Sequence, residues 1–84
     1  MPMTLEVPDD IQRALRVPEP ERQARLFVEL ACALYHREIL SFGKAAELSH
    51  LSQFRFGQEL VGRGIARHYS EDDIAEDLAY AGGQ

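Results

Sequence analysis

Side chains that could contact nucleic acid gather in the middle of this 84-residue chain, in residues 41–65. Glutamine and arginine can read base edges through paired hydrogen bonds, whereas lysine and arginine neutralise phosphates. If residues 53–61 form a helix in the major groove, the candidate DNA-binding residues are Gln53, Arg55 and Gln58 for bases, and Lys44 and Arg63 for phosphates. The same spacing also fits the solvated side of an amphipathic helix, so DNA binding is one of two interpretations.

Catalytic and metal-binding patterns are weak in this sequence. Cys32 and His36 lie four residues apart and could be neighbours on a helix, but a zinc site needs a second such pair. His50 and His68 are isolated, and the acidic residues after position 70 lack the spacing of a calcium-binding loop. We therefore expect no enzymatic activity, no metal and no cofactor, and we expect Cys32 to be a small buried residue.

The net charge of −5 argues at first against nucleic-acid binding, because phosphate contacts supply most of the affinity for DNA. Residues 1–40 carry seven acidic and five basic side chains, and residues 41–69 carry two acidic and four basic ones. Residues 70–84 carry five acidic side chains and no basic one, which accounts for the whole net charge. The basic middle and the acidic C-terminal part suggest two separate binding tasks.

The hydrophobic pattern predicts a mainly α-helical domain with one or two short strands. Residues 3–7 alternate apolar and polar side chains, as a half-buried strand does, and a proline ends the pattern. That proline and two aspartates then open a short helix at Asp9. After two further prolines, residues 22–40 contain no glycine or proline and predict the longest helix.

The predicted long helix has two apolar stripes. The first consists of Phe27, Leu30, Ala31 and Leu34. The second follows an adjoining face and consists of Val28, Cys32, Tyr35 and Ile39. Because a small monomer seldom buries both, either the helix is central in its own fold or the second stripe forms a homodimer seam. The residues of the second stripe are the candidate dimerisation residues.

Residues 41–65 predict two short helices joined by a tight turn. Ser41 can cap a helix over residues 42–48, and Ser52 can cap a second helix from Gln53 to about Val61. This is the pattern of a helix-turn-helix, with Ala46, Leu51 and Phe56 between the helices. His50 departs from it, because the turn position has a left-handed backbone that usually takes glycine. Phe54 is two residues from Phe56 and cannot share its face.

The C-terminal part predicts an extended segment followed by an acidic helix. Gly64 is suited to a left-handed helix cap, and residues 65–69 resume an alternating pattern that could pair with residues 3–7. Residues 70–81 predict a helix in which Ile74 and Leu78 lie one turn apart, until two glycines end it. Such a helix can pack on its own domain or bind in a partner's groove.

The segments GKAAELSHLS, RGI, HYS and EDDIAEDL resemble a family of small uncharacterised prokaryotic proteins regarded as antitoxins that pair with PIN-domain ribonuclease toxins. The match covers residues 41–78. The matching positions are Gly43 to Leu48, Leu51, Ser52, Phe56, Leu60, Arg63 to Ile65, Tyr69, Asp73 and Asp77. The chain departs from the family pattern at His50, where glycine is usual, and at Ala66, where proline is common.

The resemblance implies a modular antitoxin that binds operator DNA and neutralises a PIN-domain toxin. One small domain, residues 1–84, would then have a dimerisation part (1–40), a helix-turn-helix-like part (41–65) and a toxin-binding part (66–84). The candidate partner-binding residues are Tyr69, Asp72, Asp73, Ile74, Asp77 and Leu78. An acidic segment would bind the basic rim of the nuclease rather than its carboxylate-lined metal site.

Two other functions stay open from the sequence. A protein-interaction adaptor without DNA binding would suit the overall acidity. A ribbon-helix-helix-like regulator would pair residues 3–7 of two chains and direct Thr4 and Glu6 at the bases, although Glu6 repels phosphate. With no apolar run long enough to span a membrane and no basic leader, we expect a cytoplasmic protein without membrane contact.

Overall fold

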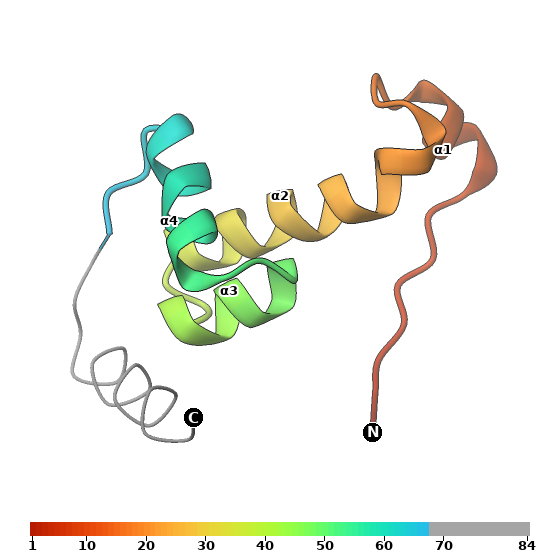
Figure 1. Cartoon of the computed structure of the whole chain (residues 1–84). Helices are drawn as coiled ribbons and strands as arrows, with labels where there is room; N and C mark the ends of the chain where they lie inside the picture. Colours follow the sequence, from red (N-terminus) through yellow and green to blue (C-terminus); the bar gives the residue numbers. More distant parts are fainter. Residues whose placement is uncertain (68–84) are drawn as a thin grey trace.

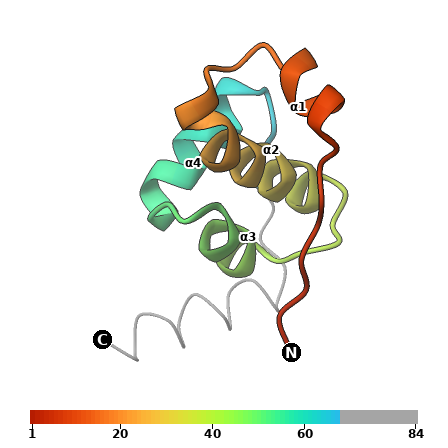
Figure 2. The same ribbon diagram turned by 90° about the vertical axis from the view of Figure 1, so that its right-hand side faces the viewer.

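The computed structural model describes residues 1–67, and these residues are mainly α-helical, as predicted (Figure 1). The elements in chain order are α1 (Asp9–Ala14), the 3₁₀ turn η1 (Glu19–Glu21), α2 (Arg22–His36), α3 (Phe42–Ser49) and α4 (Gln53–Gly62). Helices α3 and α4 pack against the C-terminal half of α2, whereas α1 lies beyond its N-terminal end (Figure 1 and Figure 2). None of the helices in residues 1–67 has the length and apolar character needed to cross a membrane.

The predicted strands are not formed in the part of the chain that the structure describes. Residues 3–7 precede α1 without sheet pairing, and Met3 and Leu5 are largely exposed. A strand needs a neighbour that exchanges backbone hydrogen bonds with it, and none of residues 1–67 pairs with this segment in that way. Residues 65–67, the start of the second predicted strand, are likewise irregular.

Helix α2 ends at His36, before the predicted boundary at Leu40. Glu38 adopts a left-handed conformation with φ 59°, and the N–H of Ile39 donates to the carbonyl of Leu34 at 2.9 Å. This bond reaches back one residue further than a helical bond and closes the helix end. Because the left-handed position holds glutamate instead of glycine, the sequence carries no clear stop signal there.

The core is an aromatic contact between the three packed helices. Tyr35 of α2 lies edge-on to Phe42 of α3 and Phe56 of α4, with ring centres 5.8 and 6.4 Å apart. The rings of Phe42 and Phe56 are 5.5 Å apart, and all three side chains are buried. Around the rings, small side chains let the helices approach closely. These are Ala31, Cys32, Ala45 and Ala46, and Leu60 completes the buried cluster.

Two of the predicted dimerisation residues lie inside this core. Cys32 and Tyr35 are each 1% exposed, and Val28 packs partly buried against the same cluster. These two side chains are covered within their own domain, so they are not available to a second chain while the domain is folded. Their burial favours the other interpretation, a long helix central to its own fold. Ile39 is exposed beyond the end of α2, and the homodimer itself stays a prediction.

Both predicted N-caps are present. The Ser41 hydroxyl accepts a hydrogen bond from the N–H of Lys44 at 3.3 Å at the start of α3. The Ser52 hydroxyl accepts one from the N–H of Arg55 at 3.1 Å at the start of α4. Each cap satisfies a backbone donor that the first helical turn leaves without a partner. The two helices therefore begin where the sequence places them.

The turn between α3 and α4 contains His50, which has the left-handed conformation expected there, with φ 64°. The imidazole ring packs against Phe27 of α2, with ring centres 4.8 Å apart. A glycine would adopt this backbone without strain but would lose the ring contact. The contact with α2 thus offsets the conformational cost of histidine at this position.

Helix α4 ends as predicted at a left-handed glycine. Gly64 has φ 70°, and the N–H of Ile65 donates to the carbonyl of Leu60 at 2.9 Å. Ile65 also packs against the core cluster that contains Leu60. This combination of a left-handed residue, a long backbone bond and an apolar contact closes the helix and directs residues 65–67 back along it.

Two substitutions at His50 separate the backbone strain from the ring contact. His50→Ala should destabilise the fold by about 1 kcal/mol, because the left-handed strain stays and the contact with Phe27 is lost. His50→Gly should leave the free energy of unfolding within about 0.5 kcal/mol of the original, because strain and contact are lost together. Urea unfolding followed by circular dichroism measures both values. Equal destabilisation by both variants would show that the backbone conformation carries no strain.

Candidate functional site

Helix α4 presents a polar strip formed by Arg55 and Gln58. Both side chains are exposed, and no residue in the described range forms a hydrogen bond or ion pair with either of them. Phe56 and Leu60 bury the opposite side of the same helix, so the helical repeat turns the polar strip away from the core. Packing of α4 therefore fixes the backbone of the strip, while its side chains remain exposed to a ligand.

Gln53 lies at the first turn of α4 and is half-buried. Its Nε2 amide nitrogen is buried and has no hydrogen-bond partner among residues 1–67. A buried amide donor without an acceptor is unfavourable by about 1–3 kcal/mol, which a ligand carrying an oxygen acceptor would recover. Of the three predicted base-reading residues, Gln53 is thus the one with a buried hydrogen-bond donor that lacks an acceptor.

Lys44 lies in the first turn of α3, where it is exposed. Its ammonium nitrogen is 3.4 Å from a carboxylate oxygen of Glu47, in a pair whose side chains are both more than half exposed. An exposed pair of this kind stabilises by about 0–1 kcal/mol, so the ammonium can exchange the carboxylate for a phosphate at little cost. The position of Lys44 is compatible with the predicted phosphate contact.

Arg63 does not join the polar strip but forms ion pairs with two glutamates, which disfavours the predicted phosphate contact. Its Nε and Nη2 atoms donate to the two carboxylate oxygens of Glu29 on α2, at 3.0 and 2.9 Å. Its Nη1 donates to the carboxylate and to the carbonyl oxygen of Glu59, at 2.7 and 2.9 Å. Two of these hydrogen bonds tie the end of α4 to α2 and two return to Glu59 of α4, so the guanidinium has a structural role.

The ion pair with Arg63 shifts the acidity of Glu29. Hydrogen bonds from the Arg63 guanidinium lower the pKa of the Glu29 carboxyl from 4.5 to about 2, with a smaller contribution from Arg25 and against some desolvation. The same contacts with Glu29 and Glu59 raise the pKa of Arg63. Both groups therefore stay charged at neutral pH, and the pair acts as an electrostatic clamp between α2 and α4.

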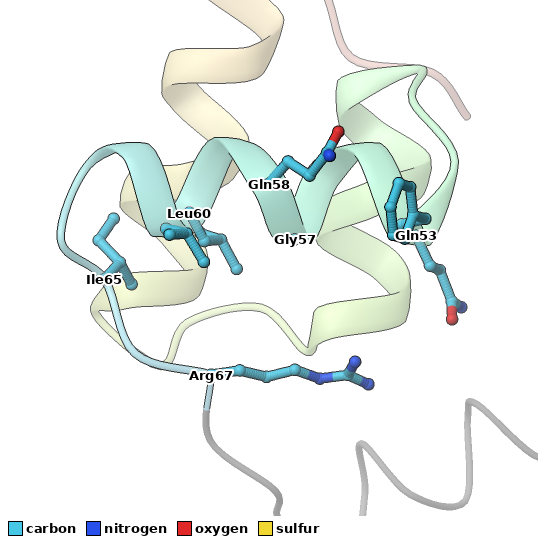
Figure 3. Close-up of a pocket in the computed structure, with 8 residues that line it drawn as sticks. Gln53, Gly57, Gln58, Leu60, Ile65 and Arg67 are labelled. Atoms are coloured by element: carbon cyan, nitrogen blue, oxygen red, sulfur yellow. The ribbon is translucent and has the colours of Figure 1, made fainter.

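An open pocket of about 440 Å³ lies beside the polar strip, between α4 and residues 65–67. We call it the α4 groove. Its lining residues are Gln53, Phe54, Gly57, Gln58, Leu60, Val61, Ile65 and Arg67. Figure 3 shows Ile65 and the long Arg67 side chain on the returning segment, facing Leu60 and Gly57 of the helix. Phe54 and Val61 are 75% and 77% exposed, so the groove offers apolar surface to solvent.

Sequence patterns identified only part of this groove. Phe54 stood out because it cannot share the face of Phe56, but Val61, Ile65 and Arg67 carried no signal of their own. Gly57 is the sequence feature that could have indicated the groove. Glycine in the middle of a helix is unfavourable and often occurs where the helix surface is open or closely approached by another group. In the structure a Cβ atom at Gly57 would meet nothing within 4 Å.

Cys32 and the histidines form no metal site in the described residues. No group of three or more metal-ligating side chains occurs within residues 1–67. Burial raises the pKa of the Cys32 thiol, so the sulfur stays protonated and poorly nucleophilic. The expectation of a small buried cysteine is confirmed. The candidate partner-binding residues lie outside the described residues: Tyr69, Asp72, Asp73, Ile74, Asp77 and Leu78.

Together these features define a small, mainly α-helical domain whose last described helix carries a polar strip and an apolar groove side by side. The chain belongs to the uncharacterised protein family UPF0175, whose family model matches residues 1–83. No solved structure is significantly similar to it.

Three relatives carry the same family name. A UPF0175 protein of Aeropyrum pernix is 42% identical over 79 residues, which cover 94% of this chain and 84% of the relative. One of Archaeoglobus fulgidus is 36% identical, covering 89% of this chain and 84% of the relative. One of Synechocystis is 31% identical, covering 95% and 85%. The similarity thus extends over nearly the whole chain and includes the N-terminal part.

The clamp between Glu29 and Arg63 should make stability depend on pH in the acid range. The folded-state pKa of Glu29 is lowered, so its contribution is complete above pH 4.5 and is lost as the pH falls towards about 2. Glu29→Gln should therefore lower the free energy of unfolding at neutral pH by about 1 kcal/mol, because the pair is partly exposed. It should also flatten the acid dependence, as measured by urea unfolding at neutral pH and at about pH 3.

Glu47→Gln is the matched control, since it removes the same charge from the exposed pair with Lys44. It should change the free energy of unfolding at neutral pH by less than about 0.5 kcal/mol. Equal losses in the two variants would show that the Glu29 contribution is general electrostatics and not the specific clamp.

Proposed function

We propose that this protein is an antitoxin of a prokaryotic type II toxin-antitoxin system, in which α3 and α4 act as a helix-turn-helix on operator DNA. The acidic C-terminal residues bind and neutralise a PIN-domain ribonuclease. The resemblance in residues 41–78 to proteins regarded as antitoxins supports the proposal. The observation that carries the DNA part is the exposed polar strip of α4, on a helix that packs against α2 and α3 through Phe56.

The geometry of the strip suits reading of the major groove. Arg55 lies in the first turn of α4, and Gln58 follows three residues later on the same side of the helix. Early residues of a recognition helix meet base edges, where arginine pairs with guanine and glutamine with adenine. Gln53, with its free amide donor, lies next to them, and Lys44 on α3 supplies a phosphate contact.

The toxin-binding part rests on charge and on the family resemblance. Residues 70–84 carry five acidic side chains and no basic one. A nuclease must guide RNA to its catalytic metal with basic side chains, and an acidic segment competes for that surface. Separate segments for DNA and for toxin would let one chain bind both.

A protein-interaction adaptor is the second candidate function, and the exposed side chains of Phe54 and Val61 favour it. Large apolar side chains on the outer side of α4 are typical of protein contacts. A third possibility, a ribbon-helix-helix-like regulator, would use Thr4 at the paired N-terminal strands of two chains. The DNA experiment below distinguishes these possibilities.

Arg55→Ala should reduce the affinity for DNA from upstream of the gene by about tenfold or more, because a two-bond contact to a base is lost. Electrophoretic shifts over a salt series measure the loss, and the wild-type affinity should fall steeply as salt rises. Arg13→Ala is the charge-matched control on α1, away from α4 (Figure 1). It should change the affinity by less than about twofold.

Each alternative gives a different result in this assay. Loss of binding in Thr4→Ala but not in Arg55→Ala would support the ribbon-helix-helix-like regulator. Absence of a salt-sensitive shift with any upstream fragment would leave the adaptor as the better description.

A chain that ends at Tyr69 should no longer inhibit its partner nuclease but should still bind DNA. All buried core residues of the described part lie between Ala31 and Leu60, so the truncation leaves them in place. The partner is first identified by affinity purification from the native cells, and inhibition is measured as protection of an RNA substrate. A chain ending at Ala81, which keeps all the acidic residues, is the control and should inhibit fully. Full inhibition by the shorter chain would exclude residues 70–81 as the inhibitory element.

A further inference from the structure

The α4 groove is not explained by DNA binding, because its exposed walls are apolar. Phe54 and Val61 lie one above the other along α4, seven residues apart, with Gly57 between them. Leu60 and Ile65 continue the apolar surface towards the core (Figure 3). Such a groove, with an apolar floor and a few polar groups at its edge, is typical of a site that takes an amphipathic helix.

We infer that the α4 groove binds an acidic segment of the same chain, residues 70–81. The sequence of this segment predicts a helix with Ile74 and Leu78 one turn apart, which gives it one short apolar stripe. This stripe would rise about 6 Å along a helix, so it fits within the roughly 11 Å stretch of α4 between the exposed side chains of Phe54 and Val61. Phe54 and Val61 lack cover among residues 1–67, and docking would bury both apolar pairs.

The chain can make this connection within one molecule. Arg67, the last described residue, lines the groove, and Ile74 follows seven residues later. Seven residues reach up to about 25 Å when extended, whereas the stretch of α4 from Phe54 to Val61 rises only about 11 Å. The link is therefore long enough for the segment to turn back onto the helix.

Charge and hydrogen bonding favour the same occupant. The residues that flank the apolar walls include Arg67 in the groove and Arg55 on the neighbouring strip. Residues 70–81 contain five acidic side chains and no basic one, so the two surfaces have opposite charge. Gln53 lines the groove, and its buried Nε2 donor lacks an acceptor among the described residues, which a carboxylate would supply once the side chain turns towards it.

Attachment to the same chain makes even a weak site effective. A short link gives an effective concentration of about a millimolar, so a groove of millimolar affinity would be substantially occupied without any partner. A docked segment covers Gln53 and Gln58, which also belong to the proposed DNA interface. Capture of the segment by a toxin would then free α4 for DNA, a consequence that rests on the proposed function. The docking itself does not.

Nuclear magnetic resonance of the full-length protein, without DNA or toxin, tests the docking. We expect nuclear Overhauser contacts between the side chains of Phe54 or Val61 and the methyl groups of Ile74 or Leu78. Gly57→Glu should abolish these contacts, because the new side chain fills the groove and repels the acidic segment. Gly62→Glu is the matched control: it adds the same charge to the same helix outside the groove, and a Cβ atom also meets nothing there within 4 Å.

The outcomes separate the possible occupants. Contacts that are lost in Gly57→Glu and kept in Gly62→Glu support docking of residues 70–81. A mixture of isotope-labelled and unlabelled chains shows whether the contacts arise within one chain, and contacts only between chains would overturn the inference in favour of a second copy. Absence of any contact between the groove and these methyl groups in the wild-type protein would overturn it entirely. Because neither DNA nor nuclease is present, none of these results depends on the antitoxin proposal.

Discussion

The contact among Tyr35, Phe42 and Phe56 determines where every candidate functional residue of α3 and α4 lies. Each ring comes from a different helix, so the contact fixes the position of α3 and α4 on α2. Truncation of one buried aromatic side chain costs about 3–5 kcal/mol, which approaches the whole stability of a small domain. Because Phe56 must face this contact, the helical repeat turns Arg55 and Gln58 outward.

The clamp between Arg63 and Glu29 shows how structure and function compete for charge in so small a chain. Residues 41–69 carry only four basic side chains, and the fold uses one of them to fasten α4 to α2. Fewer positive charges then remain for the proposed phosphate contacts. Each contact that is lost lowers by about 0.9 the slope of the logarithm of DNA affinity against the logarithm of salt concentration. A homodimer, which the sequence leads us to expect, would double the remaining contacts on a palindromic site.

Local signals in the sequence predicted the helical part well. The serine caps, the left-handed positions at His50 and Gly64 and the burial of Phe56 each follow from the chemistry of one residue and its near neighbours. The errors concern partners distant in sequence. Nothing near Arg63 shows that Glu29, on another helix, will occupy its guanidinium, and the stripe of Cys32 and Tyr35 does not reveal whether α3 or a second chain will cover it.

The overall acidity of the chain becomes understandable once the two sides of α4 are considered together. An acidic segment close to a DNA-binding helix would repel the DNA phosphates. DNA contact is therefore favoured when the segment is held away from α4 by another partner. Gln53 and Gln58 line the α4 groove and are also candidates for base contacts, which means that one surface cannot serve both occupants at once. Under the proposed function, DNA and the acidic segment would therefore compete for α4. In the proposed antitoxin, a partner that holds residues 70–81 would remove one competitor. Coupling between DNA binding and toxin binding would then follow from this shared surface without any change in the fold of α2, α3 and α4.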